Sequence, residues 1–342
     1  MTDLAKAPPQ VAPSAPPGFS VRRIRLGSLR DLVLVPPIII MLIVGAFVSD
    51  SFLTRSNLQD LLASMSWIGL LVLAETLILL TGKMDLSIES TVGIAPGVAA
   101  WLTLPKGIEH GIHVVPSGWA IPIALGVGLA IGAINAFLIV GLGLNAFIVT
   151  LGMLITLRGL LTGISSGQTF FGMGNDMTYL GTARWFGVPA SILVCVLAFI
   201  AGGLALRYLR VGRSLYAIGG NSEAARAAGI RTDRVVIGVF ILASMIAALS
   251  GLLLSGRLAS VASSQGNGAI FTVFAAAVIG GVSLNGGRGS VVGAFTGILL
   301  LYLVQNVLTF AGVSGEWFGF LNGAVILGVL IINRVVGGRT RE

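Results

Sequence analysis

Long apolar runs, separated by short polar or glycine-containing breaks, extend from about residue 33 to residue 334. A helix needs about twenty apolar residues to cross a bilayer. Ten runs meet this requirement and predict crossings at 33–49, 61–81, 87–104, 118–141, 145–165, 186–208, 235–255, 268–284, 290–312 and 317–334. The third and eighth runs are short, contain glycine and follow polar loops, so we expect one or both helices to be broken or partly re-entrant.

Composition agrees with this pattern. Of the 342 residues, 55% are hydrophobic and only 10% are charged, whereas a soluble domain carries about a quarter charged residues. This excludes a soluble globule and a disordered chain. We expect an all-α polytopic membrane protein whose 48 glycines let helices approach closely. Residues 31–336 form the expected transmembrane domain, between a proline-rich, disordered tail over 1–30 and a short tail over 337–342.

The positions of the basic residues predict the orientation, because Lys and Arg gather on the cytoplasmic side of a membrane. With the N-terminus inside and ten crossings, the outer loops hold only Arg55, Lys106, Arg184 and Arg257. Four tryptophans, which prefer the membrane interface, then lie at outer helix ends: Trp101, Trp119, Trp185 and Trp317. The distribution of the net charge of +8 therefore indicates membrane orientation, with both termini cytoplasmic, and not nucleic-acid binding.

The longest predicted cytoplasmic loop, 209–234, contains a short helix of about seven residues. Asn221 is a favourable N-cap, Glu223 suits the positive end of the helix dipole, and Gly229 suits the residue after the helix. A helix this short is marginal in water, so something must hold it. Its small surface could enter a groove of a partner or pack on its own membrane domain; the alanines that form it are Ala224, Ala225, Ala227 and Ala228.

Three motifs carry a resemblance to a known family. Glu223-Ala224-Ala225, followed by Gly229, resembles the coupling segment of ABC importer permeases, and the wider stretch with Gly220, Asn221 and Ile230 resembles the ribose/xylose-type sugar permeases. Two further stretches are similar to that family: 80–87, which ends in Asp85, Leu86 and Ser87, and 280–289, which contains Ser283 and Asn285. Lys83 and Glu89 stand where the family usually has glycine.

The resemblance implies a sugar importer in which this chain forms the pathway and is not an enzyme. ATP and Mg²⁺ would bind a separate cytoplasmic ATPase, which agrees with the lack of a phosphate-binding loop in the sequence. A second permease copy and an extracytoplasmic binding protein are the other implied partners. The residues expected to contact the ATPase are Gly220, Asn221, Glu223, Ala224, Ala225, Gly229 and Ile230.

Polar residues within or beside the spans are candidates for the pathway or a gate, because such residues are costly in a membrane. They are Glu75, Asp85, Ser87, Glu89, Asn135, Asn145, Arg158, Ser283 and Asn285. Each also has a structural alternative. Asp85 or Ser87 could cap the third helix, Asn135 and Asn145 could join or cap helices, and Arg158 could extend outward to the interface. Glu75 and Arg158 lie at different depths, so we do not expect them to pair.

Two alternatives remain, the second from another class of transporter. A branched-chain amino-acid permease would share the architecture, whereas an ion-coupled carrier should place several carboxylates or histidines mid-membrane, and only Glu75 qualifies. His110 and His113 lie in a predicted outer loop without metal-ligand spacing. If the halves 61–165 and 235–334 are repeats, they must be inverted, because an odd number of crossings separates them.

Overall fold

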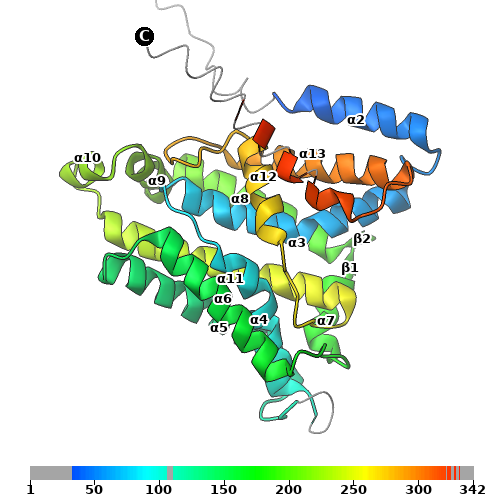
Figure 1. Cartoon of the computed structure of the whole chain (residues 1–342), viewed down its shortest axis with the longest axis horizontal. Helices are drawn as coiled ribbons and strands as arrows, with labels where there is room; N and C mark the ends of the chain where they lie inside the picture. Colours follow the sequence, from blue (N-terminus) through cyan, green and yellow to red (C-terminus); the bar gives the residue numbers. More distant parts are fainter. Residues whose placement is uncertain (1–32, 106–110, 321, 325–326, 329–330, 332–342) are drawn as a thin grey trace, which may run out of the picture.

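The computed structural model describes residues 33–105, 111–320, 322–324, 327–328 and 331. These residues form helices and one short hairpin (Figure 1). The elements are α2 (Val35–Val48), α3 (Arg55–Leu79), α4 (Ser87–Thr103), η1 (Ser117–Trp119), α5 (Ala120–Ala136), η2 (Phe137–Gly141), α6 (Ala146–Ser165), α7 (Asn175–Thr182), β1 (Arg184–Trp185), β2 (Val188–Pro189), α8 (Ala190–Tyr208), α9 (Arg210–Gly220), α10 (Ser222–Ala227), α11 (Thr232–Leu258), α12 (Ala269–Ile279) and α13 (Val291–Phe310).

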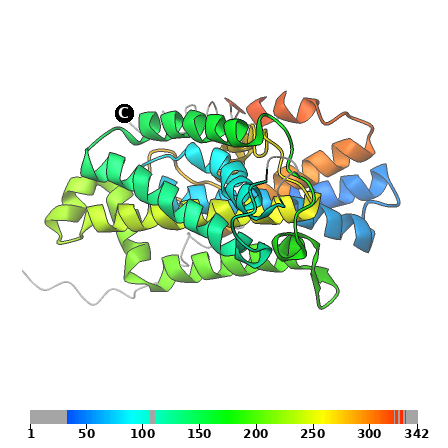
Figure 2. The same ribbon diagram turned by 90° about the horizontal axis from the view of Figure 1, so that it is seen from below.

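Helices α3 and α11 form the centre of the molecule. In the most apolar part of α3, 78% of the residues are buried, compared with 17% in α6, so α6 presents most of its apolar surface outward. Viewed from below, α11 runs through the middle, with α6 on one side and α8 on the other (Figure 2). Small residues permit this packing: Gly128 and Gly132 of α5 lie directly against the α11 backbone.

Six helices among the described residues are long and apolar enough to cross a membrane, and each coincides with a predicted run. They are α3, the continuous helix Ser117–Gly141 that consists of η1, α5 and η2, and the helices α6, α8, α11 and α13. Helix α3 begins at Arg55, earlier than expected, because the Thr54 side chain caps it by accepting a hydrogen bond from the Asn57 amide. The last predicted run, 317–334, lies partly outside the described residues, and so do both predicted tails.

Three helices at predicted runs are shorter than a crossing. Helix α2, at the first run, has 14 residues. Helix α12 has 11 residues, about 16 Å at 1.5 Å per residue, which is about half of the hydrocarbon thickness. Helix α4 has 17 residues and contains Pro96. The N-terminal ends of α12 and α4 meet inside the molecule, since the Ile270 amide at the start of α12 donates to Glu89 in the first turn of α4. Both helices are thus short, as the sequence indicated, and their re-entrant character stays a prediction.

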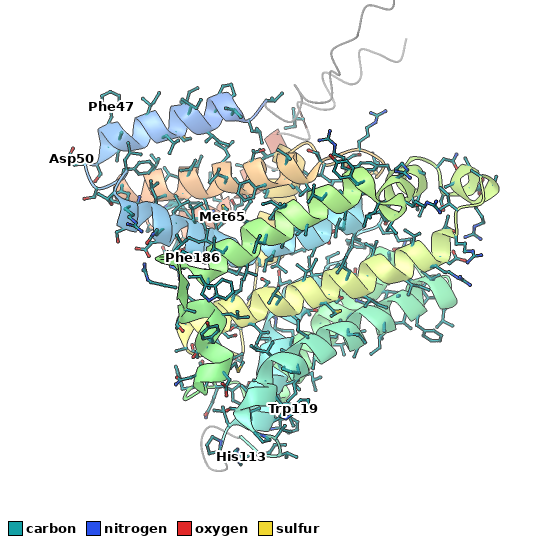
Figure 3. All side chains as sticks on the ribbon, turned by 180° about the vertical axis from the view of Figure 1, so that it is seen from behind. Phe47, Asp50, Met65, His113, Trp119 and Phe186 are labelled. Carbon is teal, nitrogen blue, oxygen red and sulfur yellow. The ribbon has the colours of Figure 1, made fainter. Side chains whose placement is uncertain are left out.

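The connections at one end of the bundle are tied together. Strands β1 and β2 form an antiparallel hairpin whose turn residues, Phe186 and Gly187, both have positive φ, as a type I′ turn requires. Phe170 and Val261 exchange backbone hydrogen bonds of 2.9 Å, which join the segments after α6 and α11. Asp50, Trp119 and Phe186 lie at the helix ends away from α10 (Figure 3).

Candidate functional site

The predicted coupling segment is a pair of helices that projects from one end of the bundle (Figure 1). The Asn221 Oδ1 accepts a hydrogen bond of 2.9 Å from the Ala224 amide, which starts α10 as the sequence predicted. The helix ends at Ala227, and Gly229, just after its C-cap residue, has a φ of +84°. The sequence did not predict α9, which precedes α10 and buries Leu215 and Ile218 against the bundle.

One side of α10 is anchored and the rest is exposed. Ala225 is buried, with 4% of its surface exposed, in the same cluster as residues of α3 and α11. Its carbonyl accepts a hydrogen bond of 3.1 Å from the Ile230 amide. Ala225 therefore packs on its own chain and cannot also enter a partner's groove. The exposed face contains Glu223, Ala224 and Ala227.

The ion pair beside α10 contributes little to holding this helix in position. An Arg226 Nη2 donates to Asp233 Oδ1 at 2.9 Å and to Thr232 Oγ1 at 3.0 Å. More than half of each charged side chain is exposed, and such pairs contribute little because solvent screens them. The position of α10 therefore depends on the burial of Ala225 and not on this pair.

All three family-like motifs meet at a junction of backbone segments, which we call the glycine junction: Gly82, Gly219, Gly286 and Gly287. The Gly287 amide donates to the Leu80 carbonyl at 3.1 Å. A Cβ added to Gly286 would lie 2.6 Å from the Gly82 Cα and 3.0 Å from the Gly219 Cα. A side chain at Gly219, Gly286 or Gly287 would collide with backbone, and Gly82 has a φ of +76°, which favours glycine. The junction joins the end of α9 to the segments after α3 and α12.

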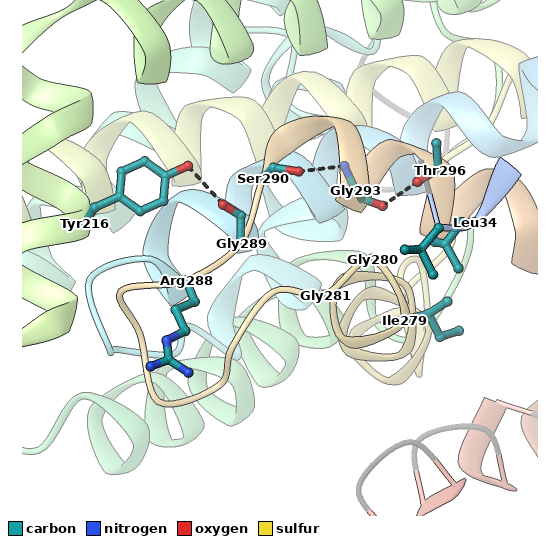
Figure 4. Close-up of a pocket in the computed structure, with 11 residues that line it drawn as sticks. Leu34, Tyr216, Ile279, Gly280, Gly281, Arg288, Gly289, Ser290, Gly293 and Thr296 are labelled. Carbon is teal, nitrogen blue, oxygen red and sulfur yellow. Dashed lines mark hydrogen bonds between the residues drawn. The ribbon is translucent and has the colours of Figure 1, made fainter. Parts of the chain in front are cut away.

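The glycine-rich 280–289 segment forms a tight turn, and the Gly287 amide within it donates outside the turn, to the Leu80 carbonyl. The Ser283 amide donates to the Arg288 carbonyl at 2.9 Å, and the Asn285 amide donates to Ser283 Oγ at 3.2 Å. Ser283 and Asn285 thus build the turn. A cavity of about 530 Å³ lies beside it, between α9, α12 and α13 (Figure 4). At its edge the Tyr216 hydroxyl donates to the Gly289 carbonyl at 3.0 Å.

Four of the pathway candidates form one fully buried network: Glu75, Asp85, Ser87 and Asn135. The Asp85 amide donates to Glu75 Oε1 at 3.3 Å. The Ser87 amide and hydroxyl donate to Asp85 Oδ1 at 2.8 and 2.6 Å, so Asp85 caps the start of α4. Asn135 Nδ2 donates to Ser87 Oγ at 2.8 Å. The network therefore ties α5 to the segment that begins at the glycine junction.

A second polar group surrounds the meeting point of α4 and α12. An Arg158 Nη2 donates to Glu89 Oε1 at 3.2 Å, and Nη1 donates to the Gln265 carbonyl at 2.8 Å. Glu89 Oε2 accepts from the Ile270 amide at 3.1 Å. The alternative that Arg158 extends outward to the interface is wrong, because this inward ion pair holds its guanidinium. As expected, Arg158 does not pair with Glu75.

The remaining pathway candidate has a structural role. Asn145 is exposed and caps α6, since its Oδ1 accepts from the Ile148 amide at 3.3 Å.

His113 is exposed, with its Nδ1 3.0 Å from the Thr103 carbonyl oxygen, and His110 lies outside the described residues. Within the described part of the chain, no group of three His, Cys, Asp or Glu side chains could hold a metal ion.

Sequence reasoning missed Gln265. This side chain is buried, and its Nε2 donates to the Val92 carbonyl and to Ser255 Oγ, both at 2.9 Å. Its Oε1 has no hydrogen-bond partner among the described residues. The polar, glycine-containing break Gln265-Gly266-Asn267-Gly268 before the eighth run was the available signal.

Short buried helices, polar groups at their ends and a projecting helix pair define a membrane transport protein. The particular family follows from comparison with known proteins. Residues 57–330 match the family described as branched-chain amino acid transport system / permease component, and the chain belongs to this family. It is therefore a permease component and not an enzyme.

The similar curated proteins are import permeases that match along nearly their whole length. The ribose import permease protein RbsC of Escherichia coli (strain K12) is 33% identical over 302 residues, which cover 87% of this chain and 92% of the relative. RbsC of Bacillus subtilis (strain 168) is 32% identical, with 86% and 90% covered. The autoinducer 2 import system permease protein LsrC of Klebsiella pneumoniae is 33% identical, with 92% and 88% covered. No solved structure matches.

Proposed function

We propose that this permease subunit carries a ribose-type sugar through a bacterial inner membrane, after an extracytoplasmic binding protein delivers it. The observation that carries the proposal is the similarity to ribose import permeases of two distant bacteria over at least 86% of both chains. The family description mentions branched-chain amino acids, but the similar proteins above are named for ribose and autoinducer 2. Ribose is therefore the substrate that the comparisons favour.

The proposed energy source is a separate cytoplasmic ATPase that docks on α10 and carries the ATP and Mg²⁺. Two features support this site. The exposed face of α10 contains small residues that allow close approach, Ala224 and Ala227, with Glu223 beside them. In addition, α9 links α10 to the glycine junction, so a displacement of α10 would move the backbone segments after α3 and α12.

The complete pathway is proposed to require a second permease copy and ten crossings with both termini cytoplasmic. The outward-facing apolar side chains of α6 support an apolar neighbour there, either lipid or another helix; they include Ile148, Ile155 and Leu160. The transmembrane domain is proposed to span residues 31–336, between the tails over 1–30 and 337–342.

The test is uptake of radiolabelled ribose by cells that lack their own ribose importer. We expect uptake when the chain is expressed with its ATPase and its binding protein, and none when either partner is omitted. The chain alone in nanodiscs should neither hydrolyse nor bind ATP. Uptake of leucine in place of ribose would identify the branched-chain alternative, and uptake without the ATPase would identify an ion-coupled carrier.

A further inference from the structure

A cavity of about 360 Å³ lies where α3, the end of α11 and the start of α12 meet. Its polar and aromatic lining consists of Trp67, Ser264, Gln265, Asn267 and Thr272. The segment between α11 and α12 turns back from the end of α11 towards the middle of the molecule and forms one wall (Figure 1). The cavity thus lies at the end of α11 opposite to α10, on the proposed outer side.

The lining has the chemistry of a site for a neutral ligand with several hydroxyl groups. No Lys, Arg, Asp or Glu lines the cavity. Trp67 supplies an aromatic ring with an apolar face, while Ser264, Gln265 and Asn267 supply hydroxyl and amide groups that can both donate and accept hydrogen bonds. The volume lies within the range of small-molecule pockets, which combine apolar walls with a few polar groups.

One polar group of the lining has an unmet hydrogen bond. Gln265 is 5% exposed, and its Oε1 lacks a partner among the described residues. A buried acceptor without a donor costs free energy, so such groups in native proteins call for a partner. Ser264 and Asn267 lie beside it and are exposed. Gln265 thus belongs to the buried side of the wall, and Ser264 and Asn267 are the exposed polar groups that a ligand in the cavity can reach.

The Glu89–Arg158 pair fixes the cavity wall formed by the segment between α11 and α12. Arg158 fixes the Gln265 carbonyl, and Glu89 fixes the Ile270 amide at the start of α12. These two contacts lie on either side of the cavity segment 266–269. Glu89 and Arg158 do not line the cavity, so they act as positioning residues.

We propose that this cavity is a sugar-binding subsite of the pathway in its outer half, with the Trp67 ring against the sugar face and with Ser264 and Asn267 bonded to its hydroxyls. The assignment rests on the proposed function. The subsite would receive the sugar before it passes inward.

The test uses Trp67→Ala, Trp67→Phe and Asn267→Ala in the complete importer, with radiolabelled ribose as the probe. We expect Trp67→Ala and Asn267→Ala each to lower uptake about tenfold, the effect of losing one good contact, whereas Trp67→Phe retains most of it. The matched controls are Trp119→Ala and Asn175→Ala, at exposed sites outside the cavity. ATPase co-purification and ATP hydrolysis with the loaded binding protein should be unchanged in every variant.

Each other outcome has a distinct meaning. Wild-type uptake in Trp67→Ala and Asn267→Ala overturns the subsite and leaves the proposed function standing. Loss of the ATPase from these variants would make the residues structural and would also overturn the subsite. A wild-type importer that takes up leucine and no ribose refutes the proposed substrate itself, and the sugar subsite with it.

Discussion

Glu89 joins three separate segments through a single carboxylate. One oxygen accepts from Arg158 of α6 and the other from the first turn of α12, while the residue itself lies in the first turn of α4. The Glu89 side chain is 5% exposed and that of Arg158 is 20% exposed. Removal of one partner of a buried ion pair leaves an uncompensated charge, which is more costly than the pair is favourable. Glu89 is therefore a positioning residue for both short helices.

We expect Glu89→Ala to destabilise the protein by about 3–5 kcal/mol, the usual cost of breaking a buried pair. The Arg158 guanidinium and the Ile270 amide would both lose a partner. The measurement is the melting temperature of the purified chain in detergent, together with ribose uptake. The control is Asp233→Ala, which breaks the exposed pair with Arg226 and should change the melting temperature little. Equal effects of the two variants would contradict the positioning role.

Gly219→Ala should disrupt the glycine junction. The new Cβ would collide with the Leu80 carbonyl and the Gly287 amide, and neither backbone group can move without its neighbours. We expect loss of uptake and early aggregation in size-exclusion chromatography. The control is Gly238→Ala on α11, where nothing lies within 4 Å of the added Cβ and where alanine favours the helix by about 1 kcal/mol. A fully active Gly219→Ala protein would mean that the junction tolerates a side chain.

At the scale of single residues, local roles could be predicted from the sequence and distant partners could not. The Asn221 cap and the positive φ of Gly229 follow from residue type within one turn. The partner of Arg158 could not be inferred, because Glu89 lies in a short helix whose depth does not follow from a count of crossings. Gln265 was missed for a similar reason, since its contacts come from helices distant in sequence.

At the scale of elements, one face of α10 packs on the bundle and the other is exposed. Ala225 anchors the helix to the bundle, and the exposed side contains Ala224 and Ala227. The sequence left open whether this helix packs on its own domain or on a partner, and the structure shows the first on one face. Helix α9 escaped prediction because three of its eleven residues are glycines, which disfavour a helix. Burial of Leu215 and Ile218 outweighs that preference.

We expect Ala224→Arg to abolish binding of the ATPase without unfolding the permease. The side chain at 224 is exposed, so a long charged group fits the free chain but would clash in a close contact. The helix should persist, because arginine is a good helix former. The measurement is co-purification of the ATPase, and a loss of about 3 kcal/mol would weaken binding more than a hundredfold. The matched control is Ala311→Arg, an exposed alanine after α13, which should leave ATPase binding intact.

For the whole molecule, the orientation can be tested with single cysteines, because the natural chain has only Cys195 and it is buried. In a Cys195→Ala background we expect Phe186→Cys to react with a membrane-impermeant maleimide on intact cells. Phe186 is 99% exposed, at the hairpin turn. Ala227→Cys should react only after the cells are permeabilised. Labelling of Ala227→Cys from outside would invert the proposed topology.

Hydrophobic length predicted the fold class and the long helices, because a bilayer imposes the same requirement on every crossing. The arrangement of those helices required the structure. Nothing in the apolar runs indicates that α3 lies at the centre and α6 at the surface, since both have a mean hydropathy of 1.9. That difference arises from packing partners, which include backbone contacts at glycines far apart in the chain.

The glycine junction also has a consequence for how the protein is made. Its contributing segments, around Gly82, Gly219 and Gly286, are synthesised at widely separated times. The contact cannot form until the ribosome has delivered the last of them, although most helices are by then available for insertion. The surface proposed to dock the ATPase is therefore completed late, and a truncated chain that ends before Gly286 would present α10 without the backbone that supports it. If the ATPase docks on α10 as proposed, its recruitment reports that synthesis has reached the last helices.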